Sequence, residues 1–316
     1  MSQFPLSLGA HVGQQNMTME EMRALWRKLD TGGCDWISAW DHIYEAPPAG
    51  GTVPHFEAVA TLAALAADTT NARLGCLVFY VGYRNPGLLA KAAVTIDHIS
   101  GGRFELGLGA GWHEWEAKAY GYDFPSAGIR LDMLDEATEI IEGLLTQERT
   151  TFTGTHFKVE DASCLPPPVN GRLPLWIGGV GEKRTLRTVA SKADGWNAAY
   201  VPADEFGRLN GVLDNWCEKL DRDPASIERS INLMFIMGAD QAGADRAEEE
   251  LATQWGPMAE RVKGGAIGGT PQQAIETVQR YLDAGADMVN IALRAPFDNE
   301  ALDAYLTEVM PAVRAR

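Results

Sequence analysis

Residues 73–111, RLGCLVFYVGYRNPGLLAKAAVTIDHISGGRFELGLGAG, decide the fold of this chain. The run at 73–80 is almost wholly apolar and closes on Val, Phe and Tyr, which predicts a buried strand. Residues 85–100 follow a helical apolar pattern with Pro86 in the first turn, and residues 103–111 predict a second strand that ends in glycines. A strand, a helix and another strand in close succession are typical of a parallel βαβ unit.

The same alternation runs from one end of the chain to the other. The expected strands are 5–11, 36–40, 73–80, 103–111, 175–179, 195–200, 231–238 and 286–293, and the expected helices include 54–69, 85–100, 130–147, 181–192, 202–220, 241–260 and 271–284. Eight strand–helix units occupy about 250 residues in a barrel, which leaves room here for insertions. We therefore predict an α/β protein, a single (β/α)8 TIM barrel over residues 1–316, with loop insertions after strand 4 and before strands 5 and 8.

Two of these insertions have a recognisable pattern. Residues 150–162 predict a hairpin before strand 5, and GGAIGGTP at 264–271 predicts a glycine-rich loop before strand 8. The alternative fold is a doubly wound sheet with a dinucleotide site. Its glycine fingerprint fails in GLGAGWHE, because Trp112 and Glu114 stand where the third glycine would have to be.

Composition excludes several classes of protein. Of the 316 residues, 46% are hydrophobic and 22% charged, which is enough apolar material for a large core. The formal net charge of −16 argues against nucleic acid and against an anionic membrane as partners. The N-terminus lacks the pattern of a signal peptide, no run reaches about 18 apolar residues, and the four cysteines form no C-x-x-C pair. We expect a cytoplasmic protein.

A catalytic metal is not expected. Metal-dependent barrel hydrolases need several histidines and carboxylates that converge on the ion. Of the six histidines, we expect His55, His98 and His156 in helices or in the hairpin, away from the strand ends. The segment HEWEA resembles the H-E-x-x-H zinc motif, but Ala117 occupies the position of the second ligand.

The C-terminal ends of barrel strands face the active site, so the residues at those ends are candidates for function. The first strand ends at His11 and the second at Asp41 and His42. An Asp-His pair can be a capped turn, but at this place a histidine can also exchange protons near neutral pH. The candidates for a substrate pocket are His11, Tyr44, Trp112 and His113.

Two glycine-rich strand ends offer room for a ligand. One of these strand ends consists of Gly109, Ala110 and Gly111. The glycines either make a tight turn or leave the strand end without side chains on one face, so that a flat ring could lie against the backbone. The run Gly178, Gly179, Val180 and Gly181 precedes a helix. It is either an ordinary turn or an anion cradle assisted by Lys183 or Arg184. Aromatic residues between 112 and 124 either pack the loop or wall an apolar pocket.

Four segments carry a resemblance to a known family: AWDH at 39–42, and residues 73–116, 175–197 and 269–291. The chain resembles the luciferase-like superfamily, most closely its actinobacterial oxidoreductases that depend on coenzyme F-420, a deazaflavin. The resemblance implies that Asp41 contacts the cofactor and that His42 donates or accepts a proton at the substrate.

The resemblance extends to the cofactor-binding segments. It implies a cis peptide bond that does not involve proline near Cys76, Leu77 and Val78, under the ring of the cofactor. It also implies that the segments 109–111 and 178–181 contact the ring and the phosphate. One residue departs from the pattern: Trp112 stands where relatives that oxidise sugar phosphates carry a glutamate, which argues against such a substrate.

The resemblance predicts an oxidoreductase that transfers a hydride between coenzyme F-420 and a small, fairly apolar organic substrate. One alternative on the same fold is an FMN-dependent monooxygenase supplied by a separate reductase. Another is a non-catalytic flavin-binding protein. Members of the superfamily often form homodimers, so a homodimer is an alternative to a monomer.

Overall fold

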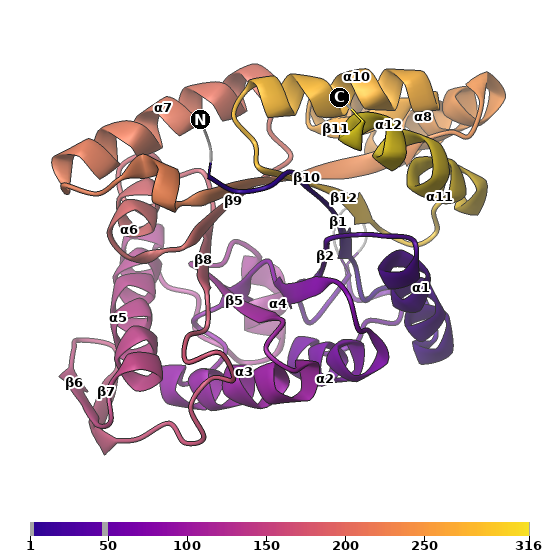
Figure 1. Cartoon of the computed structure of the whole chain (residues 1–316). Helices are drawn as coiled ribbons and strands as arrows, with labels where there is room; N and C mark the ends of the chain where they lie inside the picture. Colours follow the sequence, from indigo (N-terminus) through magenta and orange to yellow (C-terminus); the bar gives the residue numbers. More distant parts are fainter. Residues whose placement is uncertain (1–2, 46–49, 316) are drawn as a thin grey trace.

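Parallel strands form a closed ring at the centre of the protein, with helices around the outside (Figure 1). The computed structural model describes residues 3–45 and 50–315. In ring order the strands are β1 (Ser7–Val12), β2 (Trp36–Ala39), β3 (Arg73–Cys76), β5 (Phe104–Gly109), β8 (Leu175–Gly178), β9 (Gly195–Ala199), β10 (Glu228–Met237) and β12 (Met288–Leu293). β12 pairs in parallel with β1 and closes the ring, so the predicted (β/α)8 barrel is confirmed.

Helices connect the strands and cover the outside of the ring. They are α1 (Met19–Thr31), α2 (Ala58–Asp68), α3 (Pro86–Ser100), α4 (Glu114–Ala119), α5 (Ala127–Thr146), α6 (Thr185–Lys192), α7 (Ala203–Lys219), α8 (Gln241–Trp255), α9 (Ala259–Gly264), α10 (Pro271–Asp283), and α11 (Asn299–Ala304), which continues through η3 (Tyr305–Val309) into α12 (Met310–Arg314). Capping residues explain where they begin. Thr18 and Glu21 form a reciprocal capping box on α1, and Asn85 caps α3 in front of Pro86. The predicted helix at 54–69 begins later, at Ala58, because Glu57 caps it.

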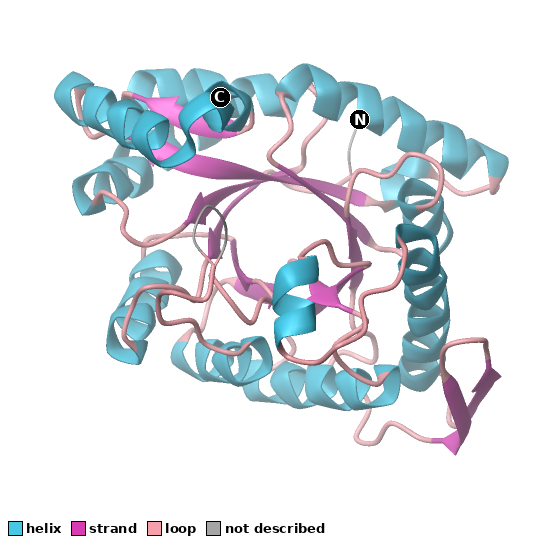
Figure 2. Ribbon diagram, turned by 180° about the vertical axis from the view of Figure 1, so that it is seen from behind, coloured by secondary structure: helices cyan, strands magenta, loops and turns pink. Residues whose placement is uncertain are grey.

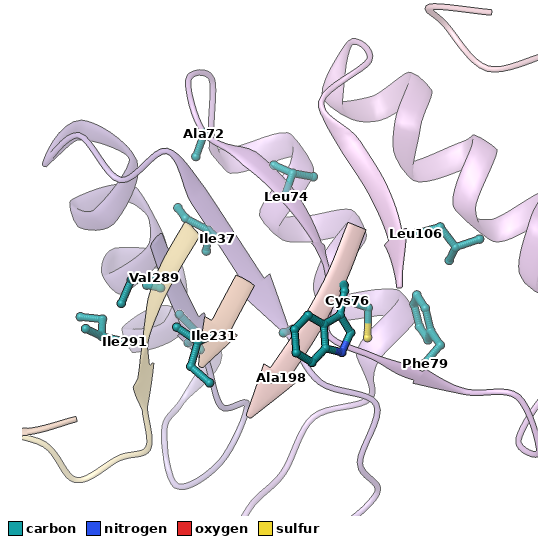
Figure 3. Close-up of a cluster of buried hydrophobic side chains, with 14 of the residues drawn as sticks. Ile37, Ala72, Leu74, Cys76, Phe79, Leu106, Ala198, Ile231, Val289 and Ile291 are labelled. Atoms are coloured by element: carbon teal, nitrogen blue, oxygen red, sulfur yellow. The ribbon is translucent and has the colours of Figure 1, made fainter. Parts of the chain in front are cut away.

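The main hydrophobic core lies between the strands and the helices. Successive residues of a strand point to opposite sides of the ring, so alternate side chains face outward. Figure 3 shows outward-facing side chains from several strands: Ile37, Leu74, Cys76, Leu106, Ala198, Ile231, Val289 and Ile291. Inside the ring, Trp36, Leu77, Trp176 and Met288 form a separate apolar cluster.

One arginine ties three strands together at the end of the barrel where the strands begin. Arg73 Nη2 lies 2.7 Å from Glu228 Oε1, and Arg73 Nη1 lies 3.1 Å from Glu105 Oε1. The Trp176 indole donates to the other oxygen of Glu105 at 2.5 Å, and the Arg73 guanidinium lies 5.5 Å from the centre of the Trp36 ring. Both carboxylates are buried, and the single positive charge of Arg73 is shared between them.

The third predicted strand, residues 73–80, is divided in two. β3 ends at Cys76, and β4 (Phe79–Tyr80) pairs further along β5, with Leu108 and Gly109. Between them the peptide bond from Leu77 to Val78 is cis, which confirms the position implied by the resemblance.

The predicted glycine-rich loop at 264–271 is wrong in part, because it contains a strand. β11 (Ala266–Gly269) pairs in parallel with residues 234–237 of β10. Farther back, residues 230–234 of β10 pair with β12. β9 pairs only with residues 228–232 of β10, so the longer β10 extends beyond β9, and β11 pairs with the backbone groups left on that side.

The other two insertions agree with the prediction. β6 (Thr150–Thr153) and β7 (Lys158–Ala162) form an antiparallel hairpin that projects from the barrel (Figures 1 and 2). The insertion after β5 contains α4, the short helix that lies across the near end of the barrel in Figure 2. That end, where the C-terminal ends of the strands meet, is called the mouth below. Within residues 3–45 and 50–315, no helix has the length and apolar character needed to cross a membrane.

Candidate active site

His42, just beyond β2 at the mouth, is held by a carboxylate from a distant part of the chain. Its Nδ1 lies 2.6 Å from Oε1 of Glu116, a residue of α4. The other oxygen, Oε2, accepts hydrogen bonds from the backbone amides of Ile43 and Tyr44 at 2.9 and 3.1 Å. Glu116 is only 1% exposed, so this network fixes both the imidazole and the start of the loop after β2.

The local sequence sets the place and the charge of Glu116. His113 is the N-cap residue of α4, and its Nδ1 accepts a long hydrogen bond from the Glu116 amide at 3.5 Å. Burial by itself raises the pKa of Glu116, but the hydrogen bond and charge of His42 and the amides of Ile43 and Tyr44 outweigh burial and lower it. Glu116 is therefore a carboxylate at neutral pH. The sequence analysis missed it, although a glutamate in a short aromatic helix after the glycines of β5 was a usable signal.

Asp41 makes different contacts from its neighbour. Its Oδ2 accepts a hydrogen bond from Arg84 Nη1 at 2.7 Å and another from the backbone amide of Tyr80 at 3.1 Å. Arg84, which the sequence analysis also missed, pairs as well with Glu57, the N-cap of α2, at 2.6 Å. Asp41 thus anchors β4 directly after the cis bond. Direct contact between Asp41 and a cofactor stays a prediction.

The glycines at the ends of β5 and β8 make room for Val78. A Cβ at Gly109 would lie 2.4 Å from Val78 Cγ2, and a Cβ at Gly178 would lie 2.7 Å from Val78 Cγ1. At Gly111, where φ is +70°, a Cβ would lie 2.5 Å from the ring of Tyr80. The expectation of bare backbone is therefore corrected: Val78, flanked by glycine backbone, forms a low shelf at the mouth.

The residues beside this shelf have structural contacts. Cys76 lies in the core outside the ring, and Leu77 in the cluster inside it. The carbonyl oxygen of Ala110 accepts a hydrogen bond from Arg130 Nε at 3.0 Å. Val78 packs against the cluster that contains Leu77, so Leu77 supports the shelf, and direct contact of these three predicted site residues with a cofactor stays a prediction.

The predicted anion cradle forms a mostly exposed turn between β8 and α6. Gly179 has φ +128°, Val180 is exposed, and α6 begins at Thr185 without a side-chain cap. Arg184 turns away toward α5, where its guanidinium pairs with Asp132 and Asp135 at 2.9 and 2.6 Å. Arg184 is therefore already engaged by two carboxylates, and the interpretation that it assists a bound anion is not supported.

Three features of the mouth fit a flat ring with an anionic tail. The shelf at Val78 offers a flat apolar contact between glycines. The Tyr80 hydroxyl is buried without a hydrogen-bond partner among the described residues, as a group that awaits a polar ligand would be. The start of α6 has no side-chain cap, which suits a phosphate, although its Leu186 amide already donates to the carbonyl oxygen of Gly181 at 3.0 Å.

An aromatic wall stands beside His42. The ring of Trp112 lies 5.2 Å from the ring of His42 and 4.7 Å from that of His113, measured between centroids. Trp112 is 59% exposed although it touches the site. Tyr44 packs on Trp115 at 4.9 Å and on Tyr120 at 5.5 Å. Of the predicted pocket residues, Trp112 and His113 thus lie against His42, and the Tyr44 ring packs farther out in the same aromatic wall.

His11 is buried rather than open to the mouth. Its Nδ1 lies 2.9 Å from the Ser38 hydroxyl, and its ring packs edge-on against Trp40 at 5.2 Å. The pKa of His11 is lowered from 6.5 to about 3. Burial is the main cause, and the charges of Arg294 and His42 add to it. His11 is therefore a neutral imidazole beneath the site.

We expect His11→Gln to reduce the acid sensitivity of the fold. Between about pH 6.5 and 3, His11 is protonated in the unfolded chain and neutral in the folded protein. The free energy of unfolding therefore falls as the pH falls through this window, by up to about 1.4 kcal/mol per pH unit from this residue. Denaturant unfolding at a series of pH values should show a shallower slope for His11→Gln. His156→Gln, in the hairpin, is the control, and equal slopes for His11→Gln and the natural protein would contradict the expectation.

A pocket of about 770 Å³ opens at the mouth beside β10 and β12. Its lining mixes apolar side chains with polar and charged ones: Met234, Ile236, Leu251, Trp255 and Phe297 beside Glu45, Arg246, Glu250 and Arg294. Arg294 lies over Tyr200 at 5.0 Å and over Trp40 at 5.5 Å, and the ring of Trp40 lies 6.1 Å from that of His42. Another cavity, of about 700 Å³, lies at the opposite end, beside Arg73 and Glu228. We place the site at the mouth because barrel chemistry takes place at the C-terminal ends of the strands.

One histidine lies elsewhere than predicted. His55 precedes α2, and its Nε2 accepts a hydrogen bond from the Trp40 indole at 2.9 Å, close to the site. The expectation that it sits in a helix is wrong, because α2 begins only after its cap at Glu57. Among the described residues, no three or more His, Cys, Asp or Glu side chains form a group that could hold a metal ion.

The fold and the site together define a (β/α)8 barrel protein with a histidine–carboxylate pair and a glycine-flanked Val78 at the C-terminal ends of its strands. The chain belongs to the family of luciferase-like monooxygenases, whose model matches residues 3–260. An F420-dependent glucose-6-phosphate dehydrogenase of Nocardia farcinica is 26% identical over 98% of this chain and 98% of that protein.

Solved structures share the fold. An F420-dependent secondary alcohol dehydrogenase, in complex with an F420-acetone adduct, superposes with a TM-score of 0.87 and 19% identity, over 98% of this chain and 99% of that one. The long-chain alkane monooxygenase LadA superposes with a TM-score of 0.82 and 15% identity, over 100% of this chain and 92% of that one. At these identities the likeness concerns the fold alone.

Proposed function

We propose that this protein is an oxidoreductase that transfers a hydride between coenzyme F-420 and a small organic substrate, with His42 as the proton donor or acceptor. The observation that carries the proposal is the imidazole of His42, held at 2.6 Å by buried Glu116 at the barrel mouth. The F420 dependence of the Nocardia farcinica dehydrogenase, to which the chain is similar over nearly its whole length, supports the choice of cofactor.

The mouth supplies contacts for each part of the cofactor. Val78, between Gly109 and Gly178, would carry the flat ring, and the turn at 179–181 before α6 would bind the phosphate. Asp41 would hold the segment under the ring through the amide of Tyr80. When bound, the deazaflavin takes or gives the hydride. The protein then has to orient the two reactants and to move one proton.

The aromatic wall favours an apolar substrate. Trp112 borders His42 at the position where the resemblance places a glutamate in sugar-phosphate dehydrogenases. The pocket beside β10 and β12 offers apolar side chains such as Met234 and Phe297 together with charged ones such as Arg294, so it would accept an organic substrate that carries a polar group. We therefore propose a secondary alcohol, a ketone or a compound of similar polarity rather than a sugar phosphate, despite the name of the relative from Nocardia farcinica.

Titration of the purified protein with oxidised deazaflavin and, separately, with FMN tests the proposal through the fluorescence of each cofactor. We expect micromolar binding of the deazaflavin and weaker binding of FMN. Binding of FMN alone would overturn the proposal in favour of a monooxygenase that needs a separate reductase. Tight deazaflavin binding with no reduction by any alcohol, and no oxidation by any ketone, would favour a non-catalytic binding protein.

We expect Gly109→Ala to weaken cofactor binding about tenfold, a loss of about 1.4 kcal/mol. The new methyl group would lie 2.4 Å from Val78 Cγ2, so Val78 would have to move and the shelf with it. The same fluorescence titration measures the effect. Gly211→Ala in α7 is the matched control, because a Cβ there meets nothing within 4 Å. Equal affinity of both variants would show that the shelf does not carry the cofactor.

A further inference from the structure

We infer that Glu116 is a positioning residue that fixes the tautomer of His42: it holds the proton on Nδ1 and leaves Nε2 to exchange a proton with the substrate. The consequence for turnover rests on the proposed function. The tautomer itself is a property of the protein alone and can be measured without cofactor.

The hydrogen bonds of Glu116 set the direction of the contact. Backbone amides can only donate, so Oε2 must accept from Ile43 and Tyr44. A carboxylate has only acceptors, so at Oε1 the proton must come from Nδ1 of His42. The lowered pKa of Glu116 agrees with this, because the ionised form persists at neutral pH. The neutral imidazole therefore carries its hydrogen on Nδ1 and a lone pair on Nε2.

Glu116 does not replace the acid that Trp112 displaces. Both of its oxygens already have partners, and its side chain is 1% exposed. It therefore acts through His42 rather than on the substrate. It also lies one helical turn farther along the chain than Trp112, in α4, whose N-cap His113 fixes the direction of the helix.

This arrangement assigns the route of the proton. In the oxidative direction, the carbon–hydrogen bond of an alcohol would break, and a bound oxidised deazaflavin would be the acceptor of its electron pair as hydride. The hydroxyl proton passes to Nε2 of His42, and the substrate becomes a carbonyl compound. In the reductive direction, the imidazolium returns that proton from Nε2 to the carbonyl oxygen as hydride arrives at carbon. One histidine carries the single proton that each direction requires.

The variant Glu116→Gln is nearly isosteric and should invert the tautomer. A glutamine has one acceptor oxygen, and the amides of Ile43 and Tyr44 both require it. The NH₂ group then faces His42, so Nδ1 must accept and the ring proton must move to Nε2. The equivalent change in the serine protease triad, aspartate to asparagine, lowers turnover about 10⁴-fold through the wrong tautomer.

Nitrogen-15 NMR of cofactor-free protein labelled in its histidines measures the tautomer directly, over a pH series that is extended until the ring signals stop changing. The His42 signals are assigned by their loss in His42→Ala. We expect the hydrogen on Nδ1 in the natural protein and on Nε2 in Glu116→Gln. Glu114→Gln is the matched control: it lies on the same helix, but its carboxylate is exposed and pairs with Lys118.

A hydrogen on Nε2 in the natural protein would overturn the inference, even if no variant folds. An unchanged tautomer in a folded Glu116→Gln protein would overturn it as well. With cofactor and substrate, Glu116→Gln should lower kcat at least 100-fold and leave cofactor affinity within about twofold. If the NMR result holds and no turnover occurs in any variant, the proposed function fails and the role of Glu116 in fixing the tautomer stands.

Discussion

Replacing His42 with alanine is expected to lower kcat by about 10² to 10⁴, the range typical for loss of a general acid or base. Without the imidazole that Glu116 holds in place, the proton has to be exchanged directly with bulk water. Cofactor affinity should change little, because the shelf at Val78 and the turn before α6 are separate from the imidazole. Single-turnover kinetics and the fluorescence titration measure the two quantities independently.

His98→Gln is the control for this experiment. It removes an imidazole from α3, where Nε2 of His98 contacts the carbonyl oxygen of Pro167 at 2.9 Å. It should retain the kcat of the natural protein. Unchanged turnover in His42→Ala would show that another group carries the proton. A parallel loss of cofactor binding would show instead that the imidazole supports the cofactor.

Arg73→Met is expected to destabilise the barrel by about 3 kcal/mol. It leaves Glu105 and Glu228 buried without their counter-charge, and breaking a buried ion pair on one side typically costs about 3–5 kcal/mol. The lower figure applies because Arg73 keeps 34% of its side chain exposed and water can enter. Denaturant unfolding, followed by tryptophan fluorescence, measures the change in the free energy of unfolding.

Two further variants test this explanation. Arg149→Met removes a largely exposed pair with Asp161 in the hairpin and should change stability by less than about 1 kcal/mol. The double variant Arg73→Met/Glu228→Met should be less destabilised than Arg73→Met, because it removes one of the two orphaned carboxylates. A double variant that is equally or more destabilised would contradict the electrostatic explanation and point to packing.

Much of the fold could be predicted because its signals are local. Apolar runs alternate with helical patterns along the chain, and helix caps such as Asn85 before Pro86 can be identified from neighbouring residues. The predictions were wrong where the local sequence was compatible with more than one structure. The residues of β11 look like a loop, since they are half glycine, and become a strand only because β10 offers a free edge. His55 looks helical until Glu57 is seen to cap α2.

The sequence by itself determined the barrel and brought Asp41 and His42 to its mouth, because strand ends follow from the order of the elements. Only the tertiary structure decided which partners these residues have. Glu116 reaches His42 across 74 positions of the chain, and Arg84 reaches Asp41 across 43. Such pairs depend on how the ring closes and on how α4 is turned over the mouth, which no local pattern encodes. The sequence pair Asp41-His42 therefore indicated where the chemistry takes place, and the contacts in the folded protein separated the two roles. Asp41 holds the backbone of Tyr80 beside the shelf, and His42, held by Glu116, faces the substrate that we propose.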